Sequence, residues 1–460
     1  MSASTGSFRS QLSTASKHLS IRFASSIGLR LVSTIVLTRL LAPEIYGVFA
    51  VVLVYLYFLE MISDLGLRSL VLTREGEVTD VFLKTCWTIS ILRGGVILLF
   101  SMVLSLVFLI AQNANLFAQD SPYSASVLPP AIVCIGFAAL IQGFETPMRF
   151  MSEREMAFGR LTAVDLARNV VTLAVTIALA FYLRSVWALV IGQIFRSVIH
   201  VILNNVVFPG PKLAFCLDRE SIRVLISRGK WVLGQSTLTV LSQSFDRIFL
   251  GFVMTSTTFG FYYTARQLVD LVPQFLQALN NAVILQVFRK LHESTPEDFR
   301  RNYYRYRLVL DGAAGLVAGG LIIAAPLFVD IIFDDRYAGV APIMQILSLS
   351  ILIFGLNILQ NAFNAQHRFD VVTKLSIISV LSLVGGLAFA TFVLDSVTAA
   401  LFVVALHRLP EAIVVTYMGH RRGWVVLWRE GIIIAVFALG ALLGWGVVQL
   451  AELVFWQPVG

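Results

Sequence analysis

The sequence contains few charged residues and few cysteines. Only 13% of its 460 residues are charged, whereas 57% are hydrophobic and the mean hydropathy is +0.82. A soluble globular chain carries about 25% charged residues, so this composition excludes an ordinary water-soluble domain. The three cysteines, Cys86, Cys134 and Cys216, have neither metal-ligand nor redox spacing, and the sequence has no Walker motif. We therefore expect no cofactor, no metal site and no nucleotide hydrolysis.

Apolar stretches long enough to cross a bilayer recur along nearly the whole chain. One helical crossing needs about 20 mainly apolar residues. Residues 1–19 are polar and hydroxyl-rich, unlike a cleavable signal, so the first apolar stretch is expected to be a true span. An all-α polytopic membrane protein is predicted. Its thirteen spans lie near 20–42, 45–67, 82–111, 124–146, 160–183, 186–208, 231–253, 258–287, 308–333, 341–365, 371–394, 397–418 and 431–453.

The distribution of Lys and Arg indicates the orientation of these spans. Basic residues collect on the cytoplasmic side of membrane proteins, which explains the net charge of +8 without nucleic acid as a partner. With the N-terminus inside, 25 of the 35 Lys and Arg residues fall in cytoplasmic segments, three in outside segments and seven within spans. One missed span would exchange the inside and outside assignments of every later loop. The bias therefore supports the predicted number and order of the spans.

A break after the sixth span divides the chain. Residues 209–230 open with Pro-Gly-Pro and then carry Ile222, Leu225 and Ile226 at helical spacing, opposite several arginines. This pattern fits an amphipathic helix on the cytoplasmic membrane surface, and equally a plain tether. The predicted parts are an N-terminal transmembrane lobe (1–208), a cytoplasmic interfacial linker (209–230), a C-terminal transmembrane lobe (231–418) and an extra C-terminal transmembrane helix (419–460).

Two short outside turns resemble each other. Tyr46-Gly47 lies between spans 1 and 2, Phe259-Gly260 lies between spans 7 and 8, and an aromatic residue follows two positions after each glycine. Glycine lets a turn or a facing backbone come close. Spans 1 and 7 both run outward, so the two halves form a parallel repeat. Transporters with repeats place the substrate between the halves, near the midplane.

Several motifs along the chain occur in an order that is typical of one family. They are Arg39-Leu-Leu-Ala-Pro-Glu-Ile-Tyr-Gly-Val-Phe, Ser63-Asp-Leu-Gly-Leu, Arg154-Glu-Met-Ala-Phe-Gly-Arg-Leu, Asp246-Arg247 and Tyr337-Ala-Gly-Val-Ala-Pro-Ile-Met. Over almost the whole chain, this order resembles that of the bacterial polysaccharide flippases. These are the Wzx-like lipid-linked oligosaccharide translocases of the multidrug/oligosaccharidyl-lipid/polysaccharide (MOP) exporter superfamily. One departure is Ala42, where the family usually has glycine.

The resemblance implies a fold and a function. The fold would be MATE/MurJ-like, with two parallel six-helix lobes around a central cavity and about one extra helix. The protein would be a membrane transporter, not an enzyme, in the bacterial cytoplasmic (inner) membrane. By alternating access it would move an undecaprenyl-pyrophosphate-linked oligosaccharide unit to the periplasmic leaflet, for exopolysaccharide, O-antigen or capsule synthesis. Its expected partners are this lipid-linked substrate, membrane lipids and other polysaccharide-assembly proteins, and a monomer is expected.

Charged residues inside the spans mark the candidate binding site. Each costs at least about 2.5–3.5 kcal/mol at the centre of a membrane helix, so it normally faces a cavity or a partner. Guanidinium groups bind phosphate bidentately and keep their charge, which suits a pyrophosphate headgroup. Arg30 and Arg247 are the first candidates, because they lie on the two helices that line the cleft in this family. They are followed by Arg266, Arg196 and Arg39, the last of which could equally extend to the outer lipid headgroups.

Uncharged and acidic side chains complete the candidate site. Amides on spans 7, 8 and 10 could hold sugars or bind between helices: Gln243, Gln277, Asn280, Asn281, Asn361 and Asn364. The acids that could bind a coupling ion or form ion pairs are Asp64, Asp246, Asp270 and Glu60.

Sequence spacing also predicts local ion pairs. The predicted pairs are Asp165 with Arg168, Arg266 with Asp270, Arg408 with Glu411 and Asp64 with Arg68. Asp311 lies near the cytoplasmic end of its span and is expected to be hydrated.

Two other functions are compatible with a multi-span chain. A cation-coupled multidrug exporter of the same superfamily should have a net acidic cavity, whereas the embedded arginines here match the acids in number. A sugar polymerase or ligase should have a large outside loop with catalytic groups. The largest outside loop, residues 112–123, has no base–acid pair of that kind.

Overall fold

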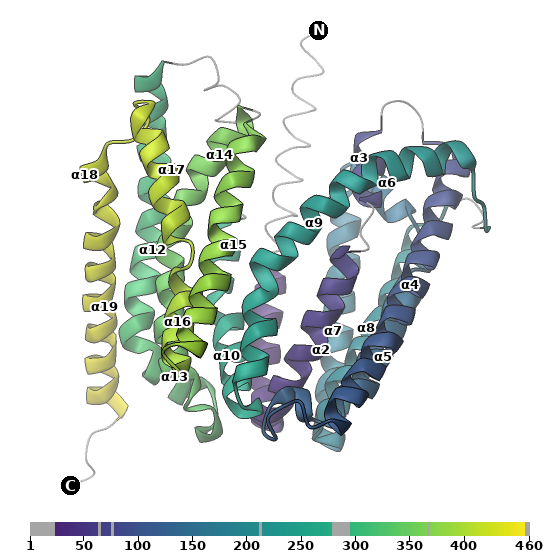
Figure 1. Ribbon diagram of the computed structural model, residues 1–460, viewed down its shortest axis with the longest axis horizontal. Coiled ribbons are helices and arrows are strands. Elements are labelled where there is room, and N and C mark those ends of the chain that lie inside the picture. The colour runs from purple at the N-terminus through teal and green to yellow at the C-terminus, as the bar shows by residue number, and fades with distance from the viewer. Residues whose placement is uncertain are drawn as a thin grey trace. The chain divides into compact units, whose positions relative to one another are not determined.

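A computed structural model describes residues 24–62, 66–74, 78–210, 214–277, 295–366 and 368–455. Within these ranges the protein contains helices and connecting turns but no strand (Figure 1). The chain forms two compact units, residues 1–260 and 261–460, and each is described here by itself.

The first unit begins with a helix over residues 24–40. Its further helices are α2 (Pro43–Ile62), α3 (Leu67–Thr73), α4 (Asp80–Asn113), the short 3-10 helix η1 (Pro122–Ser124), α5 (Leu128–Gln142), α6 (Met148–Arg154), α7 (Phe158–Leu183), α8 (Val186–Val207) and α9 (Arg219–Val253). α4 packs along α5, α7 along α8, and α2 along α9.

Helix α10 (Ser256–Val269) crosses the boundary between the units, and residues 271–277 are helical. The second unit continues with α12 (Pro296–Ile332), η2 (Asp335–Tyr337), α13 (Val340–Ser348), η3 (Leu349–Leu356), α14 (Asn357–Ala365), α15 (Phe369–Phe392), α16 (Val397–Leu406), α17 (Leu409–Arg421), α18 (Leu427–Glu430) and α19 (Ile432–Phe455). In this unit α12 packs along α19 and α15 along α16.

Nine helical stretches in the described ranges are long and apolar enough to cross a membrane. They coincide with nine of the predicted spans. The other four fall on the helix of residues 24–40, on the 15-residue apolar helix α5, on the second half of α9, and on α10 with residues 271–277. The chain is therefore a multi-pass membrane protein, and the count of thirteen spans stays a prediction.

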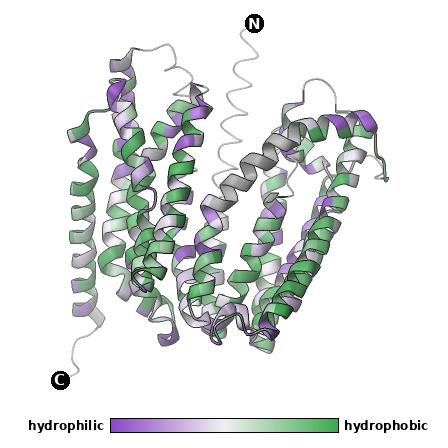
Figure 2. Ribbon diagram, in the orientation of Figure 1, coloured by the Kyte–Doolittle hydropathy of each residue, from purple (hydrophilic) through white to green (hydrophobic). Residues whose placement is uncertain are grey.

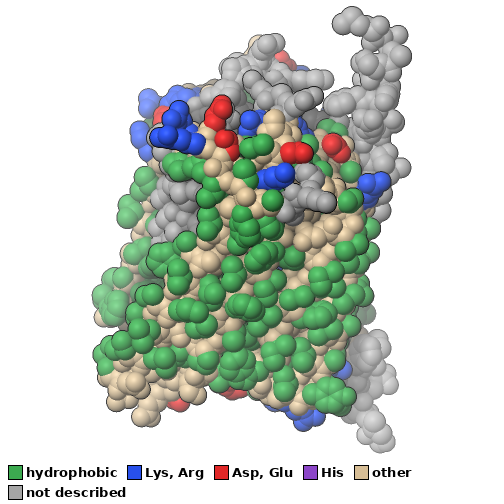
Figure 3. All heavy atoms as spheres, turned by 90° about the vertical axis from the view of Figure 1, so that its right-hand side faces the viewer, with side chains coloured by type: hydrophobic (Ala, Val, Ile, Leu, Met, Phe, Trp, Pro, Cys, Tyr) green, Lys and Arg blue, Asp and Glu red, His purple; other side chains and the backbone are tan. Residues whose placement is uncertain are grey.

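The surface fits a membrane environment. Hydrophobic residues run along the helices, and hydrophilic residues gather towards helix ends (Figure 2). On the face in Figure 3, apolar side chains cover the middle, whereas Lys, Arg, Asp and Glu gather at the ends. On α4, for example, Leu99, Phe100 and Val103 have 58–64% of their surface exposed. Lipid tails can cover such an apolar band, whereas water would leave it unstable.

Polar caps set the start of the long helices. The Thr79 hydroxyl accepts a hydrogen bond from the Phe82 amide at the start of α4, and Thr295 does the same for Asp298 at the start of α12. At the start of α9 the Asp218 carboxylate accepts from the Ser221 amide over 2.8 Å. These hydrogen bonds to Ser221 hold the pKa of Asp218 below its ordinary value.

Helix α9 runs without interruption from the predicted linker into the predicted seventh span. Leu225, in the linker, is fully buried, and it belongs to a core cluster with Leu67, Val71, Phe82 and Cys86. The apolar side of the linker is thus packed partly on α3 and α4. The lobe boundaries at 208 and 231 stay a prediction.

The two aromatic–glycine turns meet each other. A Cβ on Gly47 would overlap the carbonyl of Ser256 and lie 3.2 Å from the Gly260 nitrogen, so only glycine permits this approach. The Thr257 hydroxyl donates to the Glu44 carboxylate over 2.7 Å. Beside them Tyr123 of η1 is fully buried and stacks on Phe252 with ring centroids 4.0 Å apart. The start of α2, the end of α9 and the start of α10 therefore pack on one another.

A buried ion cluster ties α12 to α18 in the second unit. Arg307 binds Asp311, with Nε 2.6 Å from Oδ2, and also binds Glu430 and the Tyr303 hydroxyl. The expectation that Asp311 is hydrated is wrong, because this carboxylate is 93% buried beside Arg307. α12 begins at Pro296, so Asp311 lies four turns inside the helix rather than near its end.

Candidate functional site

Charged side chains from five helices of the first unit meet at one place. Glu60 of α2 interacts electrostatically with Arg93 of α4 and with Arg196 of α8. Arg196 also interacts with Arg30, on the helix of residues 24–40, and with Asp165 of α7. Two of the predicted headgroup contacts, Arg30 and Arg196, are thus brought together with the predicted acid Glu60.

A second set of hydrogen bonds continues from Asp165. Arg149 of α6 donates to Asp165 over 3.0 Å, and Arg168 lies 3.2 Å from the same carboxylate. Arg149 also lies 3.7 Å from Glu145, just before α6, and donates to the Asn204 amide oxygen over 3.0 Å. Asp165 is 97% buried, so these charged partners are what make its burial tolerable.

These eight residues form one continuous cluster, which we call the unit 1 charge network. Its members are Arg30, Glu60, Arg93, Glu145, Arg149, Asp165, Arg168 and Arg196. Five are cationic and three are anionic, so the network carries an excess of two positive charges. In the low dielectric of a membrane protein this excess makes the site attractive to an anion.

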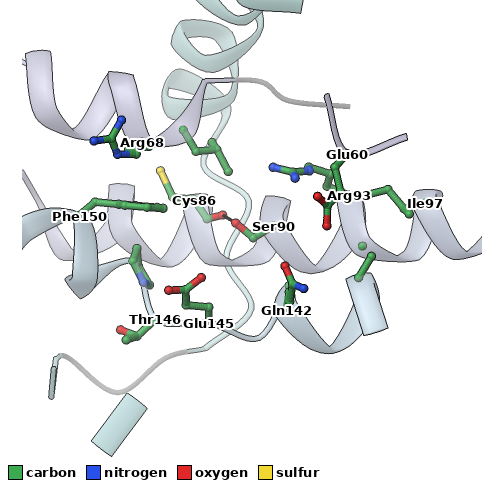
Figure 4. Close-up of a pocket in the computed structure, with 15 residues that line it drawn as sticks. Glu60, Arg68, Cys86, Ser90, Arg93, Ile97, Gln142, Glu145, Thr146 and Phe150 are labelled. Carbon is green, nitrogen blue, oxygen red and sulfur yellow. Dashed lines mark hydrogen bonds between the residues drawn. The ribbon is translucent and has the colours of Figure 1, made fainter. Parts of the chain in front are cut away.

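A polar cavity of about 150 Å³ opens against the network (Figure 4). Glu60 and Arg93 lie beside each other at one end of it, and Glu145, Thr146 and Phe150 lie towards the other. Cys86, Ser90 and Gln142 contribute to its wall. A space of this size with polar walls can hold several water molecules.

The other predicted site residues of the first unit lie elsewhere on it. Arg247 is half-buried on α9 beside the 97% buried Asp246. Gln243 is exposed on the same helix. Arg39 is exposed near the end of the helix of residues 24–40, which fits the alternative that it extends to lipid headgroups.

Arg266 and Asp270 form an ion pair in the second unit, with 3.0 Å between Nε and Oδ1, as their spacing predicted. Gln277 and Asn361 are half-buried. Asp64, Asn280 and Asn281 lie outside the described residues, as does the side chain of Asn364.

Local pairing was predicted well and long-range pairing was not. The Asp165–Arg168 pair and the Arg408–Glu411 pair, at 3.3 Å, are confirmed. Gln360 of α14 also binds Glu411. Arg68, the predicted partner of Asp64, binds Glu153 of α6, with Nε 2.9 Å from Oε2.

Sequence reasoning missed four members of this region. Glu145 lies within the predicted fourth span and was given no role, Arg149 was assigned to the cytoplasmic segment after that span, and His200 and Asn204 of α8 were given no role. The signal was present in α8, where Arg196, His200 and Asn204 follow one another at four-residue intervals and so share one helix face.

A family model described as "Polysaccharide biosynthesis protein" matches residues 36–342, two thirds of the chain. The chain belongs to this polysaccharide biosynthesis protein family. It is 21% identical over 378 residues to the lipopolysaccharide biosynthesis protein WzxC of Escherichia coli (strain K12). The match covers 81% of this chain and 73% of WzxC. The predicted resemblance is thus confirmed.

Solved structures show the fold of this family member. The lipid II flippase MurJ, in an inward closed conformation, superimposes with a TM-score of 0.63 at 13% identity over 93% of this chain and 98% of MurJ. An inward-facing multidrug resistance MATE transporter of the MOP superfamily gives a TM-score of 0.65 at 15% identity, over 89% of this chain and 94% of that one. The predicted MATE/MurJ-like fold is confirmed.

Proposed function

We propose that this protein is a flippase for an undecaprenyl-pyrophosphate-linked oligosaccharide and that the unit 1 charge network binds its pyrophosphate. The observation that carries the proposal is the excess of two positive charges among side chains from six helices and the connection before α6. A diphosphate brings two or more negative charges, and arginine binds them with fixed geometry at any physiological pH. Membership of a polysaccharide biosynthesis family supports a sugar-linked cargo.

The proposal includes the predicted setting. The protein lies in the bacterial inner membrane with its N-terminus in the cytoplasm, and it delivers the oligosaccharide to the periplasmic leaflet by alternating access. It acts as a monomer beside other polysaccharide-assembly proteins. Arg247 and, in the second unit, Arg266 are further candidate contacts to the headgroup, and the amides Gln243, Gln277 and Asn361 are candidate contacts to the sugars.

The cationic network also separates this proposal from drug export. An exporter of organic cations gains affinity from acidic groups in a low dielectric, and the unit 1 charge network has the opposite sign. A sugar polymerase or ligase would need a base and an acid held beside its acceptor site outside the membrane. The outside connection around η1 is instead packed by Tyr123 against α9.

Binding of undecaprenyl pyrophosphate to the purified protein in nanodiscs tests the site. Replacing Arg30 or Arg196 with Gln removes one charged hydrogen-bond donor, which typically contributes about 1.5–3 kcal/mol. We expect affinity to fall by roughly one to two orders of magnitude. Arg184→Gln is the matched control, because Arg184 is exposed at the end of α7, outside the network. Equal affinity of all three variants and the wild type would reject the site.

Arg247 is tested separately, because it is not a member of the unit 1 charge network. In cells, Arg30→Ala or Arg247→Ala should reduce the arrival of lipid-linked sugar at the outer leaflet at unchanged expression. Unchanged transport by both variants would rule out these two arginines as headgroup contacts.

A further inference from the structure

Helix α18 is held against α12 in the second unit. The Tyr304 hydroxyl of α12 accepts a hydrogen bond from the Val426 amide over 2.8 Å and donates to the Glu430 carboxylate over 2.9 Å. Glu430 also binds the buried Arg307 of α12. Val426 precedes α18 and Glu430 ends it, so both ends of this short helix are attached to α12 and the residues between them have a fixed position.

Arg429 of α18 is exposed and held between two aromatic rings. Its guanidinium carbon lies 5.3 Å from the Tyr304 ring centre and 5.2 Å from the Trp428 ring centre, within the range of cation–π contact. The adjacent Glu430 is bound by Arg307 instead. The two rings restrict the guanidinium, so its charge has a fixed position before any ligand binds.

A second exposed arginine lies beside this group. Arg305 directly follows Tyr304 on α12. Neither Arg305 nor Arg429 forms an ion pair with a residue that the structure describes. Arg301, one turn before Arg305, is by contrast neutralised by Asp298 over 2.7 Å. The two arginines beside Tyr304 are therefore the available cations at this end of α12.

The charges buried beneath these arginines do not cancel them. Arg307 binds both Asp311 and Glu430, so the buried group carries one negative charge. Arg305 and Arg429 add two positive charges, which leaves an excess of one among these five residues. The positive charges are the exposed ones, so the surface that a ligand meets is cationic.

Both arginines lie where their helices enter an apolar zone. After Arg305, α12 exposes the apolar side chains of Leu308 and Val309. After Arg429 and its neighbour, no charged residue follows along the span of α19 until Glu452. Exposed apolar side chains that follow directly on exposed basic ones mark the boundary between headgroups and hydrocarbon in a membrane helix.

The two boundaries lie at the same level. Where α12 and α19 pack side by side, Gly315 meets Val436 and Gly319 meets Gly440, so both helices run in the same direction (Figure 1). The same offset places Arg429 level with Leu308, about one turn from Arg305, in agreement with its contact to the Tyr304 ring. Both guanidinium groups can thus reach one headgroup.

We propose that Arg305, Trp428 and Arg429, which we call the cationic edge, bind the phosphate of an anionic phospholipid. Guanidinium groups bind phosphate oxygens bidentately, and basic residues at a membrane boundary attract anionic lipids. Trp428 is 72% exposed at a level where tryptophan favours the headgroup region. Leu308 and Val309 can contact the acyl chains, which a free phosphate ion lacks. The proposal does not depend on the proposed flippase function.

Native mass spectrometry of the full chain in detergent measures lipid binding at the cationic edge. With phosphatidylglycerol and phosphatidylcholine at equal concentration, we expect the wild type to retain phosphatidylglycerol preferentially. Arg305→Gln and Arg429→Gln should each lower the affinity for phosphatidylglycerol by about fivefold and leave that for phosphatidylcholine unchanged. Arg184→Gln, which removes an exposed arginine of the first unit, is the matched control. No loss in the first two variants, or an equal loss in all three, would overturn the site.

Trp428 provides a second readout that requires no comparison of affinities. The difference in emission between the wild type and Trp428→Phe isolates its fluorescence among the seven tryptophans. In nanodiscs, phosphatidylglycerol with brominated acyl chains should quench this emission more strongly than brominated phosphatidylcholine, and Arg429→Gln should remove the difference. Equal quenching by the two lipids in the wild type would overturn the proposal. Displacement of the brominated lipid by the same concentration of undecaprenyl pyrophosphate would also overturn it, because the edge would then bind the transport substrate.

Discussion

At the scale of single residues, burial separates two neighbours on the first turns of α9. Leu225 has no exposed surface and packs in the core cluster with Leu67, Val71 and Phe82, whereas Ile226 is 59% exposed. The two residues are adjacent in sequence and equally apolar. Only the packed one should matter to the stability of the first unit.

Leu225→Ala should destabilise the protein by about 2–5 kcal/mol, because it removes packed methyl groups and leaves a cavity. Ile226→Ala should lower the free energy of unfolding far less, because the Ile226 side chain is exposed and its removal leaves no cavity. Thermal unfolding in the same detergent, followed by fluorescence, measures the difference. Equal losses would mean that this part of the chain lies on the membrane surface and not against α3 and α4.

The charge network shows which residue relationships can be predicted from sequence. Pairs three or four apart, such as Asp165 with Arg168, follow from helix geometry and were predicted. Arg149 with Asp165 and Glu145 with His200 join residues from different elements. Their contact depends on how α5, α6, α7 and α8 pack, and hydropathy carries no information about that packing. Arg149 was assigned to a cytoplasmic segment and Glu145 was given no role, so neither residue was predicted to belong to the site.

At the scale of elements, hydropathy and charge placement were sufficient for the helices themselves. The continuity of α9 was harder to predict. Pro209-Gly-Pro stops α8, but no proline occurs between residues 212 and 272, and Asp218 caps a new helix that nothing in the sequence then interrupts. The linker and the seventh span were separated by polarity, which sets where a helix lies in a membrane but does not end it.

The contact between the two aromatic–glycine turns can be tested by crosslinking. In a background without Cys86, Cys134 and Cys216, the pair Glu44→Cys and Thr257→Cys should form a disulfide readily, because these side chains touch. Adding Gly47→Ala should lower the crosslinking yield, since its Cβ would displace the Ser256 backbone. Gly95→Ala is the control, because a Cβ there meets open space. An unchanged yield with Gly47→Ala would contradict the close approach.

Helix α19 packs on α12 with their backbones in close contact. A Cβ on Gly440 would lie 2.5 Å from the carbonyl oxygen of Leu316, whereas one on Gly446 would meet nothing within 4 Å. Gly440→Leu should therefore lower the free energy of unfolding by about 1–3 kcal/mol, because the leucine side chain overpacks this contact. Gly446→Leu should leave it nearly unchanged. Thermal stability of the two variants in one detergent distinguishes them. Similar stability would mean that α19 does not pack on α12 through this face.

At the scale of the whole molecule, the flippase proposal rests on three observations. The chain belongs to a polysaccharide biosynthesis family, shares the fold of MurJ and MATE proteins, and has an excess of two positive charges in the unit 1 charge network.

The most direct measurement follows a fluorescent undecaprenyl-pyrophosphate-linked oligosaccharide in vesicles that contain the purified protein. Loss of the sugar signal to a membrane-impermeant glycosidase reports movement between leaflets. The account predicts that the wild type and Arg184→Gln speed this movement well above that in protein-free vesicles, and that Arg30→Gln and Arg196→Gln slow it by at least about tenfold. Movement no faster than in protein-free vesicles, combined with rapid export of an organic cation by the same preparation, would contradict the account.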